Sequence, residues 1–305
     1  MTVPSPPTQK EQAYIDELRD DFRNLPALQD NAHSEQRWLD NMKLLSELVA
    51  SEDPRNFLQW NIIKRTMEVG DADFLATELN FLRQNTNWSR WEKAIREVAV
   101  GAPTFSTIYP ASSGNLIHHA YHVAQFEDKC GEQINNYECI FEFGGGYGGM
   151  YRLVHNLGFE GKYIIFDLPA FSALQRYYIK NIGLEVHTGE SFAAAKSGVL
   201  LISDLDQLKN LLSDHMPVDN GMFIASWSLS ETPMAFRALV LSLLTRFKAF
   251  LIAYQGQFEG HNNIQFFSQW KKSKPQYQWC NYQIEHIPNE FYRNNYYLMG
   301  QKILP

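Results

Sequence analysis

The feature that most constrains the fold is a glycine-rich turn, Glu142–Gly149 (EFGGGYGG), which stands between an apolar run and an amphipathic segment. The run before it, Cys139–Phe143, is short and nearly continuous in apolar residues, which is typical of a buried parallel strand. The segment after it carries apolar residues at helical spacing, namely Met150, Leu153, Val154 and Leu157. Strand, glycine turn and helix in this order predict an α/β fold whose ligand lies across the strand ends.

The rest of the chain after residue 139 continues this alternation of strands and helices. Further parallel strands are expected at Tyr163–Phe166, Val199–Ile202, Met222–Ala225 and Ala249–Tyr254, with Leu184–His187 as another candidate. Helices are expected at about 148–158, 170–181, 205–213, 232–246 and 262–272. Thr232 is expected to cap the 232–246 helix, with Pro233 at its first position. Two tyrosine-rich segments, Tyr277–Ile287 and Phe291–Ile303, predict a closing antiparallel hairpin.

The first part of the chain has helical patterns and no clear strand. Residues 1–9 contain three prolines and no apolar run, which predicts a flexible leader and no signal peptide. Amphipathic helices are expected around 14–22, 38–49, 71–84, 88–98 and 115–125, with Ser34 as the N-cap of the second. We therefore expect a helical region over residues 1–128, followed by a Rossmann-like domain over 129–305 with a doubly wound, mostly parallel sheet.

The charge balance bears on the class of ligand. Among 305 residues, 27 are Lys or Arg and 34 are Asp or Glu, which gives a net charge of −7. A protein that neutralises phosphate backbones is normally basic, so a small substrate is expected rather than nucleic acid. Three cysteines make a disulfide scaffold unexpected, which favours the cytoplasm. No window approaches the roughly 18 apolar residues of a membrane span.

Two ligand classes fit the glycine turn, and charge separates them. Asp167 ends the next strand, 21 residues after Gly146, where a carboxylate can accept hydrogen bonds from ribose hydroxyls. The glycines also satisfy the G-x-G-x-x-G pattern of dinucleotide sites, but Glu142 would repel a pyrophosphate on the loop. S-adenosylmethionine has no phosphate, and Glu142 can hold its amino group. We expect S-adenosylmethionine; an NAD-dependent sugar oxidoreductase or epimerase and a non-catalytic cofactor-binding subunit are the alternatives.

Three segments also resemble the motifs of a known family: Glu142–Tyr151 (EFGGGYGGMY), Phe166–Tyr178 (FDLPAFSALQRYY) and Ala225–Pro233 (ASWSLSETP). They resemble the sugar O-methyltransferases, bacterial class I enzymes associated with surface polysaccharide synthesis. The resemblance covers about residues 110–300, and its most specific parts are the Asp-Leu-Pro triplet and the Ser-Glu pair. It implies methyl transfer from S-adenosylmethionine to a sugar hydroxyl, with the sugar either nucleotide-linked or part of a surface glycan.

The resemblance also implies a set of cofactor contacts, position by position. Glu142, Gly144 and Gly146 would contact the methionine part, with Gly145 beside them, and Asp167 would bind the ribose. Leu168 would pack against the adenine, and Asp204 would bind its amino group. Ser226, at the end of the fourth strand of the alternating region, completes this set. By analogy, the helical region would cover the acceptor site or form a homodimer interface.

O-methylation needs the acceptor oxygen aligned with the methyl group and a base or a metal that removes its proton. Glu231, in the loop after the fourth strand, is a candidate acid/base or sugar ligand; the alternative is a favourable charge at the following helix N-terminus. Trp227 beside it is either a sugar-stacking surface or part of the core. No set of carboxylates compels a metal site, so a divalent metal is left open and no ligands are assigned to one.

Histidines are the other candidates for the base. His118 and His119 lie on one expected helix, with His122 one turn beyond His118. These histidines do not form an H-E-x-x-H arrangement, so a zincin site is excluded. The alternative for this cluster is hydrogen-bonded histidines on an amphipathic helix. His261, in a polar loop after the fifth strand, is a further candidate for substrate contact or proton abstraction.

Overall fold

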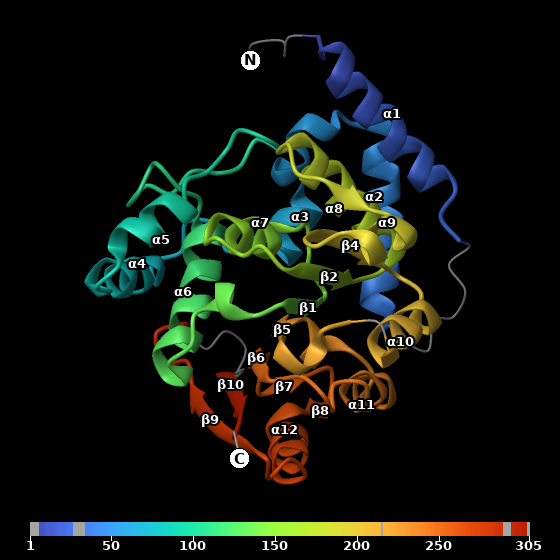
Figure 1. The fold of residues 1–305 in the computed structure, drawn as a ribbon. Coiled ribbons are helices and arrows are strands. Elements are labelled where there is room, and N and C mark those ends of the chain that lie inside the picture. Colours follow the sequence, from blue (N-terminus) through green and yellow to red (C-terminus); the bar gives the residue numbers. More distant parts are fainter. Residues whose placement is uncertain (1–5, 27–33, 215, 289–293, 304–305) are drawn as a thin grey trace.

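The computed structural model describes residues 6–26, 34–214, 216–288 and 294–303, and its central element is an eight-stranded sheet (Figure 1). The strand order is β3-β4-β2-β1-β5-β6-β10-β9. Every neighbouring pair is parallel except those of β10, which runs antiparallel to both β6 and β9. The strands are β1 Cys139–Phe143, β2 Lys162–Phe166, β3 Val186–His187, β4 Gly198–Ile202, β5 Gly221–Ser226, β6 Ala249–Gln255, β9 Tyr277–Gln283 and β10 Asn295–Lys302.

The two faces of this sheet are covered by different helices, and the strand residues alternate between two cores. Ile140 of β1 belongs to one core, whereas its neighbour Phe141 belongs to the other. The first core also receives α6 (Gly114–Cys130), α7 (Gly149–Asn156) and α8 (Pro169–Asn181). The second receives α9 (Gly189–Ala194), α10 (Leu205–Asp214), α11 (Met234–Ser242) and α12 (Asn263–Lys272). The expected doubly wound, mostly parallel, Rossmann-like sheet with a closing antiparallel hairpin is confirmed.

The N-terminal helices form an outer layer on the first face (Figure 1). Helices α1 (Gln9–Arg23) and α2 (Gln36–Ser51) pack on α8, while α4 (Leu75–Gln84) packs on α6 and α5 (Trp88–Ala94) on α7. The short α3 (Asn61–Thr66) follows a 3-10 turn, η1 (Pro54–Gln59). Buried side chains of these helices belong to the same core as the sheet face beneath them. The helical region therefore shares its core with the sheet, and the expected boundary near residue 128 falls in the last turn of α6.

Several expected element ends differ from the structure. Thr232 does not cap a helix, because the chain after β5 first forms a 3-10 turn, η4 (Ser228–Glu231), and α11 begins only after Pro233. The Thr232 hydroxyl instead donates to the carbonyl of Leu229 at 2.8 Å. Helix α2 has Glu35 rather than Ser34 at its N-cap. Residues 1–5 of the expected leader lie outside the described residues, and its expected end at residue 9 differs from the structure, since Thr8 forms a capping box with Glu11 and α1 begins at Gln9.

Helix α6 and the closing hairpin are both present, with ends that differ from the expected ones. Helix α6 runs to Cys130, beyond the expected end at 125, and Gly131 with φ +70° ends it. The hairpin expected from 277 to 303 is present as β9 and β10, while the start of its second segment at Phe291 lies outside the described residues. All three cysteines are free. Within the described ranges, the helices are too short or too polar to cross a membrane.

Candidate active site

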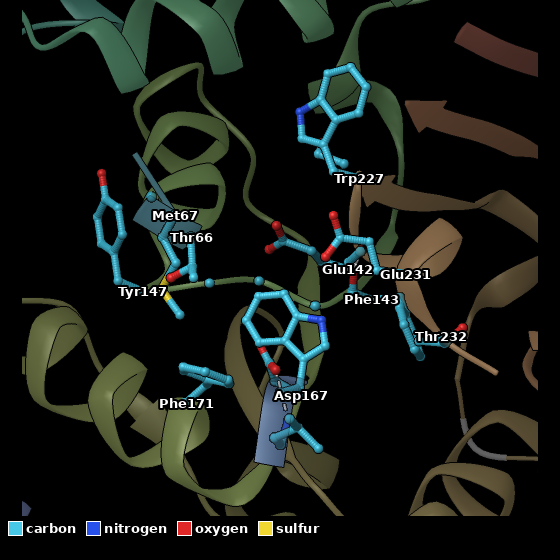
Figure 2. A pocket seen from close by; sticks show the side chains of 18 of the residues that line it. Thr66, Met67, Glu142, Phe143, Tyr147, Asp167, Phe171, Trp227, Glu231 and Thr232 are labelled. Atoms are coloured by element: carbon cyan, nitrogen blue, oxygen red, sulfur yellow. Dashed lines mark hydrogen bonds between the residues drawn. The ribbon is translucent and has the colours of Figure 1, made fainter. Parts of the chain in front are cut away.

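A cavity of about 990 Å³ opens at the carboxyl ends of the parallel strands (Figure 2). Residues that follow β1, β2, β4 and β5 line it, together with residues of α6 and of the N-terminal helices. The chain leaves β1 through α7 to reach β2 on one side, and it later places β5 on the other side. Ligands of open α/β sheets bind at such a switch point, so this cavity is the expected position of the site.

The glycine loop forms the floor of this cavity. Gly144 has φ +72°, and a Cβ there would lie 2.3 Å from Cβ of Ser228. A Cβ at Gly145 would lie 2.6 Å from Cγ2 of Ile165. Gly146 also has a positive φ, +57°, and the nearest atoms to a Cβ there belong to Met67 at 3.7 Å and beyond. Close packing therefore requires glycine at positions 144 and 145. Gly146 instead lies next to Met67 of the N-terminal region.

Glu142 places a buried carboxylate against this loop. It is the fourth residue of β1, and its Oε2 accepts a hydrogen bond from the hydroxyl of Tyr163 at 2.9 Å. The same Oε2 would lie 3.2 Å from a Cβ at Gly145, so the carboxylate faces the middle of the glycine loop. Burial raises the pKa of Glu142 to about 8, and the nearby charge of Asp167 adds to this effect. A cation bound in the cavity would relieve this cost.

Asp167 follows β2 and has a similar environment. Its carboxylate accepts hydrogen bonds from the amide of Leu168 and from Nε2 of Gln175, both at 2.8 Å. Burial raises its pKa to about 7, although these hydrogen bonds oppose the shift. At the end of β5, the hydroxyl of Ser226 is buried without a partner within the described part of the chain. Asp204 accepts from the amide of Gln207 at 2.7 Å, which places it at the start of α10.

All eight residues expected to bind the cofactor line this one cavity: Glu142, Gly144, Gly145, Gly146, Asp167, Leu168, Asp204 and Ser226. The sequence could place them together because each one lies within three residues of the carboxyl end of a strand of the parallel sheet. Their individual roles stay predictions. In Figure 2, Glu142 and Asp167 approach the cavity from two neighbouring strands, with Tyr147 of the glycine loop on its far side.

The catalytic candidates divide into those that reach the cavity and one that does not. Glu231 lines it, and its Oε1 accepts from Nε2 of Gln255 at 2.7 Å. His118 and His119 line it from α6. His261 lies outside the cavity, because the short antiparallel pair β7 (Gln257–Phe258) and β8 (His261–Asn262) diverts the chain, and its Nε2 lies 3.3 Å from Glu35. The expected role of His261 at the site is therefore not supported.

The histidines of α6 are more buried than an amphipathic surface helix requires. His118 and His122 are buried, and their rings have centroids 4.1 Å apart. Nδ1 of His118 lies 2.8 Å from the carboxylate of Glu78, and Nδ1 of His122 bonds the hydroxyl of Tyr297. Asn115, one turn before them, donates to the hydroxyl of Tyr147 at 3.0 Å. This bond ties the histidine-bearing part of α6 to the glycine loop.

Several lining residues were not expected from the sequence. Trp38 and Met42 of α2 and Met67 after α3 reach the cavity, and Trp38 packs edge-on against Phe171 at 5.7 Å between ring centroids. No local pattern distinguishes these side chains from core residues of amphipathic helices. Asn115 had a weak signal, because it lies three and four residues before His118 and His119 and so shares their side of α6.

No family model and no curated protein matches the chain. Solved structures with some similarity include a Podospora anserina methyltransferase with bound SAH (12% identity; 79% of this chain and 92% of that chain covered; TM-score 0.40). Others are the methyltransferase domain of a bacterial Hen1 (13%; 61% and 97%; TM-score 0.42) and the glycopeptide N-methyltransferase MtfA (10%; 60% and 94%; TM-score 0.36). At TM-scores below 0.5, these similarities decide neither the activity nor the substrate.

Within residues 6–26, 34–214, 216–288 and 294–303, no group of three or more His, Cys, Asp or Glu side chains is placed to hold a metal ion.

Proposed function

We propose that this chain is an S-adenosylmethionine-dependent methyltransferase. The observation that carries the proposal is the buried carboxylate of Glu142, which faces the middle of the glycine loop. S-adenosylmethionine supplies an electrophilic methyl group on a positively charged sulfur, next to an ammonium group. A buried carboxylate with a raised pKa is stabilised by such a cation and destabilised by an anion.

The charge of the whole cavity supports this choice over a dinucleotide. Five acidic residues line the cavity, namely Glu68, Glu142, Asp167, Asp204 and Glu231. Arg65 is the only lysine or arginine among the described lining residues. A pyrophosphate on the glycine loop would raise the pKa of Glu142 further and would find little cationic compensation in this lining, which argues against the NAD-dependent alternative.

The cofactor would be held by residues that the fold already brings together. We assign Glu142 to the amino group and Asp167 to the ribose hydroxyls, because both carboxylates are buried at the strand ends and accept hydrogen bonds. Leu168 and Phe171 would pack against the adenine, and Asp204 would bind its amino group. Trp38 and Met67 would close the cavity from the N-terminal side. The expected cover by the helical region would thus lie over the cofactor.

The acceptor we propose is a sugar hydroxyl. Beyond β1, toward β5 and β6, the cavity is lined by groups that hydrogen-bond or stack without a strong charge, namely Asn115, Trp227, Gln255 and Asn295, together with Glu231. Such a surface suits a polyol, whose hydroxyls need several donors and acceptors and whose ring packs on an aromatic face. The resemblance to sugar O-methyltransferases favours a sugar in surface polysaccharide or nucleotide-sugar metabolism. A cytoplasmic location and a homodimer stay predictions.

Titration calorimetry with S-adenosylhomocysteine and with NAD tests this proposal. We expect wild-type protein to bind S-adenosylhomocysteine at micromolar affinity, and Asp167→Ala to weaken it by about 100-fold, since buried charge-assisted hydrogen bonds are lost. Labelled S-adenosylmethionine is then incubated with a panel of sugars and nucleotide sugars. Binding of NAD alone would establish the oxidoreductase alternative. Cofactor binding without transfer to any sugar would favour the non-catalytic subunit or another acceptor class.

A further inference from the structure

A methyl transfer to a hydroxyl requires a group that accepts the proton, and several side chains of the cavity are candidates. We propose that His118 is this general base and that Glu78, which the sequence did not single out, is the residue that positions it and stabilises its charged form. This inference rests on the proposed function, because the base acts only if the acceptor is a hydroxyl.

Glu78 is a fully buried carboxylate shared by two histidines. It lies on α4, and Nδ1 of His118 lies 2.8 Å from its Oε1 and 3.0 Å from its Oε2. Nε2 of His286 lies 2.8 Å from the same Oε1. Burial alone would raise the pKa of Glu78, but the two imidazoles lower it below its usual value. The carboxylate is therefore ionised at neutral pH and can only accept, so Nδ1 of His118 is the donor of this pair.

This hydrogen bond determines which nitrogen of His118 can act. When Nδ1 carries the hydrogen, the electron pair of the neutral ring lies on Nε2. His118 lines the cavity, and no protein group in the described ranges forms a hydrogen bond with its Nε2. Its ring lies parallel to that of Trp227, with an interplanar angle of 2° and 6.2 Å between centroids. The hydrogen bond to Glu78 thus fixes the tautomer and the orientation of His118. Its Nε2 is left available to accept a proton, and the residue lines the cavity.

The other ionisable groups near His118 lack one of these properties. His119 lines the cavity, but its Nδ1 is buried without a partner, and burial lowers its pKa to about 3. A proton taken up there would create a charge that the hydrogen bonds given for the described residues do not join to a carboxylate, although the charge of Glu78 acts on it from a distance. His122 bonds Tyr297 and lies outside the cavity lining, and His286 uses its Nε2 to bond Glu78. Glu231 remains the rival base, since it lines the cavity and its Oε1 accepts a hydrogen bond from Nε2 of Gln255.

The acceptor hydroxyl transfers its proton to Nε2 of His118 while its oxygen forms a bond to the methyl carbon. The bond between that carbon and sulfur breaks, and its electron pair stays on sulfur, which leaves a neutral thioether. The resulting imidazolium is stabilised by Glu78 through the Nδ1 hydrogen bond until the proton passes to solvent.

The test compares Glu78→Gln, His118→Gln and Glu231→Gln, with His155→Gln as a matched control on the exposed side of α7. Each variant is measured for S-adenosylhomocysteine affinity, and for kcat and KM on the acceptor that the sugar panel identifies. We expect His118→Gln to lower kcat by at least about 100-fold and Glu78→Gln by about 10-fold or more, with cofactor affinity within about twofold of wild type. The control keeps wild-type values. A large kcat loss in Glu231→Gln without one in His118→Gln would overturn the proposal.

A second measurement separates positioning from mere structural support. In nitrogen-15 spectra recorded at a pH where the ring is neutral, His118 of wild type should show the tautomer with hydrogen on Nδ1. Glu78→Gln should lose this preference, while its cofactor affinity shows that the fold persists. An unchanged tautomer together with unchanged kcat would exclude the role of Glu78. Wild-type protein that neither binds S-adenosylhomocysteine nor methylates a sugar would instead refute the proposed function, whatever the tautomer.

Discussion

The two parts of the cavity are built in different ways. The part beside β1 and β2 consists of short continuous segments, Glu142–Gly146 and Asp167–Leu168, whose backbone positions follow from the ends of parallel strands. The part beside β5 and α6 depends on side chains that are distant in sequence, such as Glu78 and His286, which are 208 residues apart. A ligand held by strand ends and glycines is encoded locally, whereas an acceptor site and its base depend on how helices pack. The first part is therefore expected to control cofactor affinity and the second to control turnover.

The largest expected effect tests the local part. Gly144→Ala introduces a Cβ that would collide with Ser228, at a residue with φ +72°. We expect cofactor affinity to fall by more than about 100-fold and stability to fall by about 2–4 kcal/mol, since strain and overpacking add. The matched control is Gly131→Ala, with φ +70° and no atom within 4 Å of the added Cβ, which should cost only about 1 kcal/mol. Equal losses in both variants would show that glycine is needed at position 144 only for its positive φ, and not for the close approach of Ser228.

The next prediction concerns the pH dependence of cofactor affinity. Because the pKa of Glu142 is raised to about 8, the carboxyl is largely protonated below that pH and must ionise to pair with an ammonium group. Affinity for S-adenosylhomocysteine should rise between pH 6 and pH 8 by up to about 10-fold per pH unit, with release of protons. Glu142→Gln should weaken binding at pH 8 and flatten this dependence. Calorimetry in two buffers of different ionisation enthalpy measures the protons released, and a flat profile in wild type would contradict the assignment.

We expect a smaller effect of Glu142 on the stability of the ligand-free protein. Its ionisation lowers this stability, whereas it raises the affinity for the cofactor. A carboxyl whose pKa is higher in the folded than in the unfolded state contributes stability below its unfolded pKa, which is lost as pH rises through the folded pKa. For Glu142 this window extends from about 4.5 to about 8. At pH 8, ligand-free Glu142→Gln should therefore be more stable than wild type, by about 1 kcal/mol or more. Thermal unfolding at pH 5 and pH 8 tests this, and a variant less stable at both values would show that the hydrogen bond of Tyr163 outweighs desolvation.

The smallest expected effect is at a residue outside the cavity. His261→Ala should change cofactor affinity and turnover by less than about twofold, because its ring faces Glu35 and does not line the site. Steady-state kinetics and calorimetry on the same preparation measure both values. A tenfold loss of turnover would mean that the acceptor extends to the β7 and β8 hairpin, and it would enlarge the second part of the site.

The difference between locally encoded features and features that depend on packing also explains which parts of the structure could be predicted from the sequence. The five buried parallel strands were predicted correctly because such strands are continuous apolar runs, and the glycine turn was placed correctly after β1 because the chain turns tightly there. The 3-10 turn that displaced Thr232 was not foreseen, since a residue at positive φ, Trp227 at +67°, carries no compositional signal. Glu78 was missed because an acidic residue on an amphipathic helix is normally exposed, and only the packing of α4 on α6 buries it against His118. His261 was misplaced because a loop after a strand does not reveal a short hairpin within it.

The most direct test of the division between the two parts is a crystal structure of the protein with S-adenosylhomocysteine. We predict that the amino group of the ligand contacts Glu142 and that its ribose hydroxyls contact Asp167, while the space beside His118 and Trp227 stays free for the acceptor. A ligand whose adenosine lies beside Trp227 and His118, or one bound outside this cavity, would contradict the account.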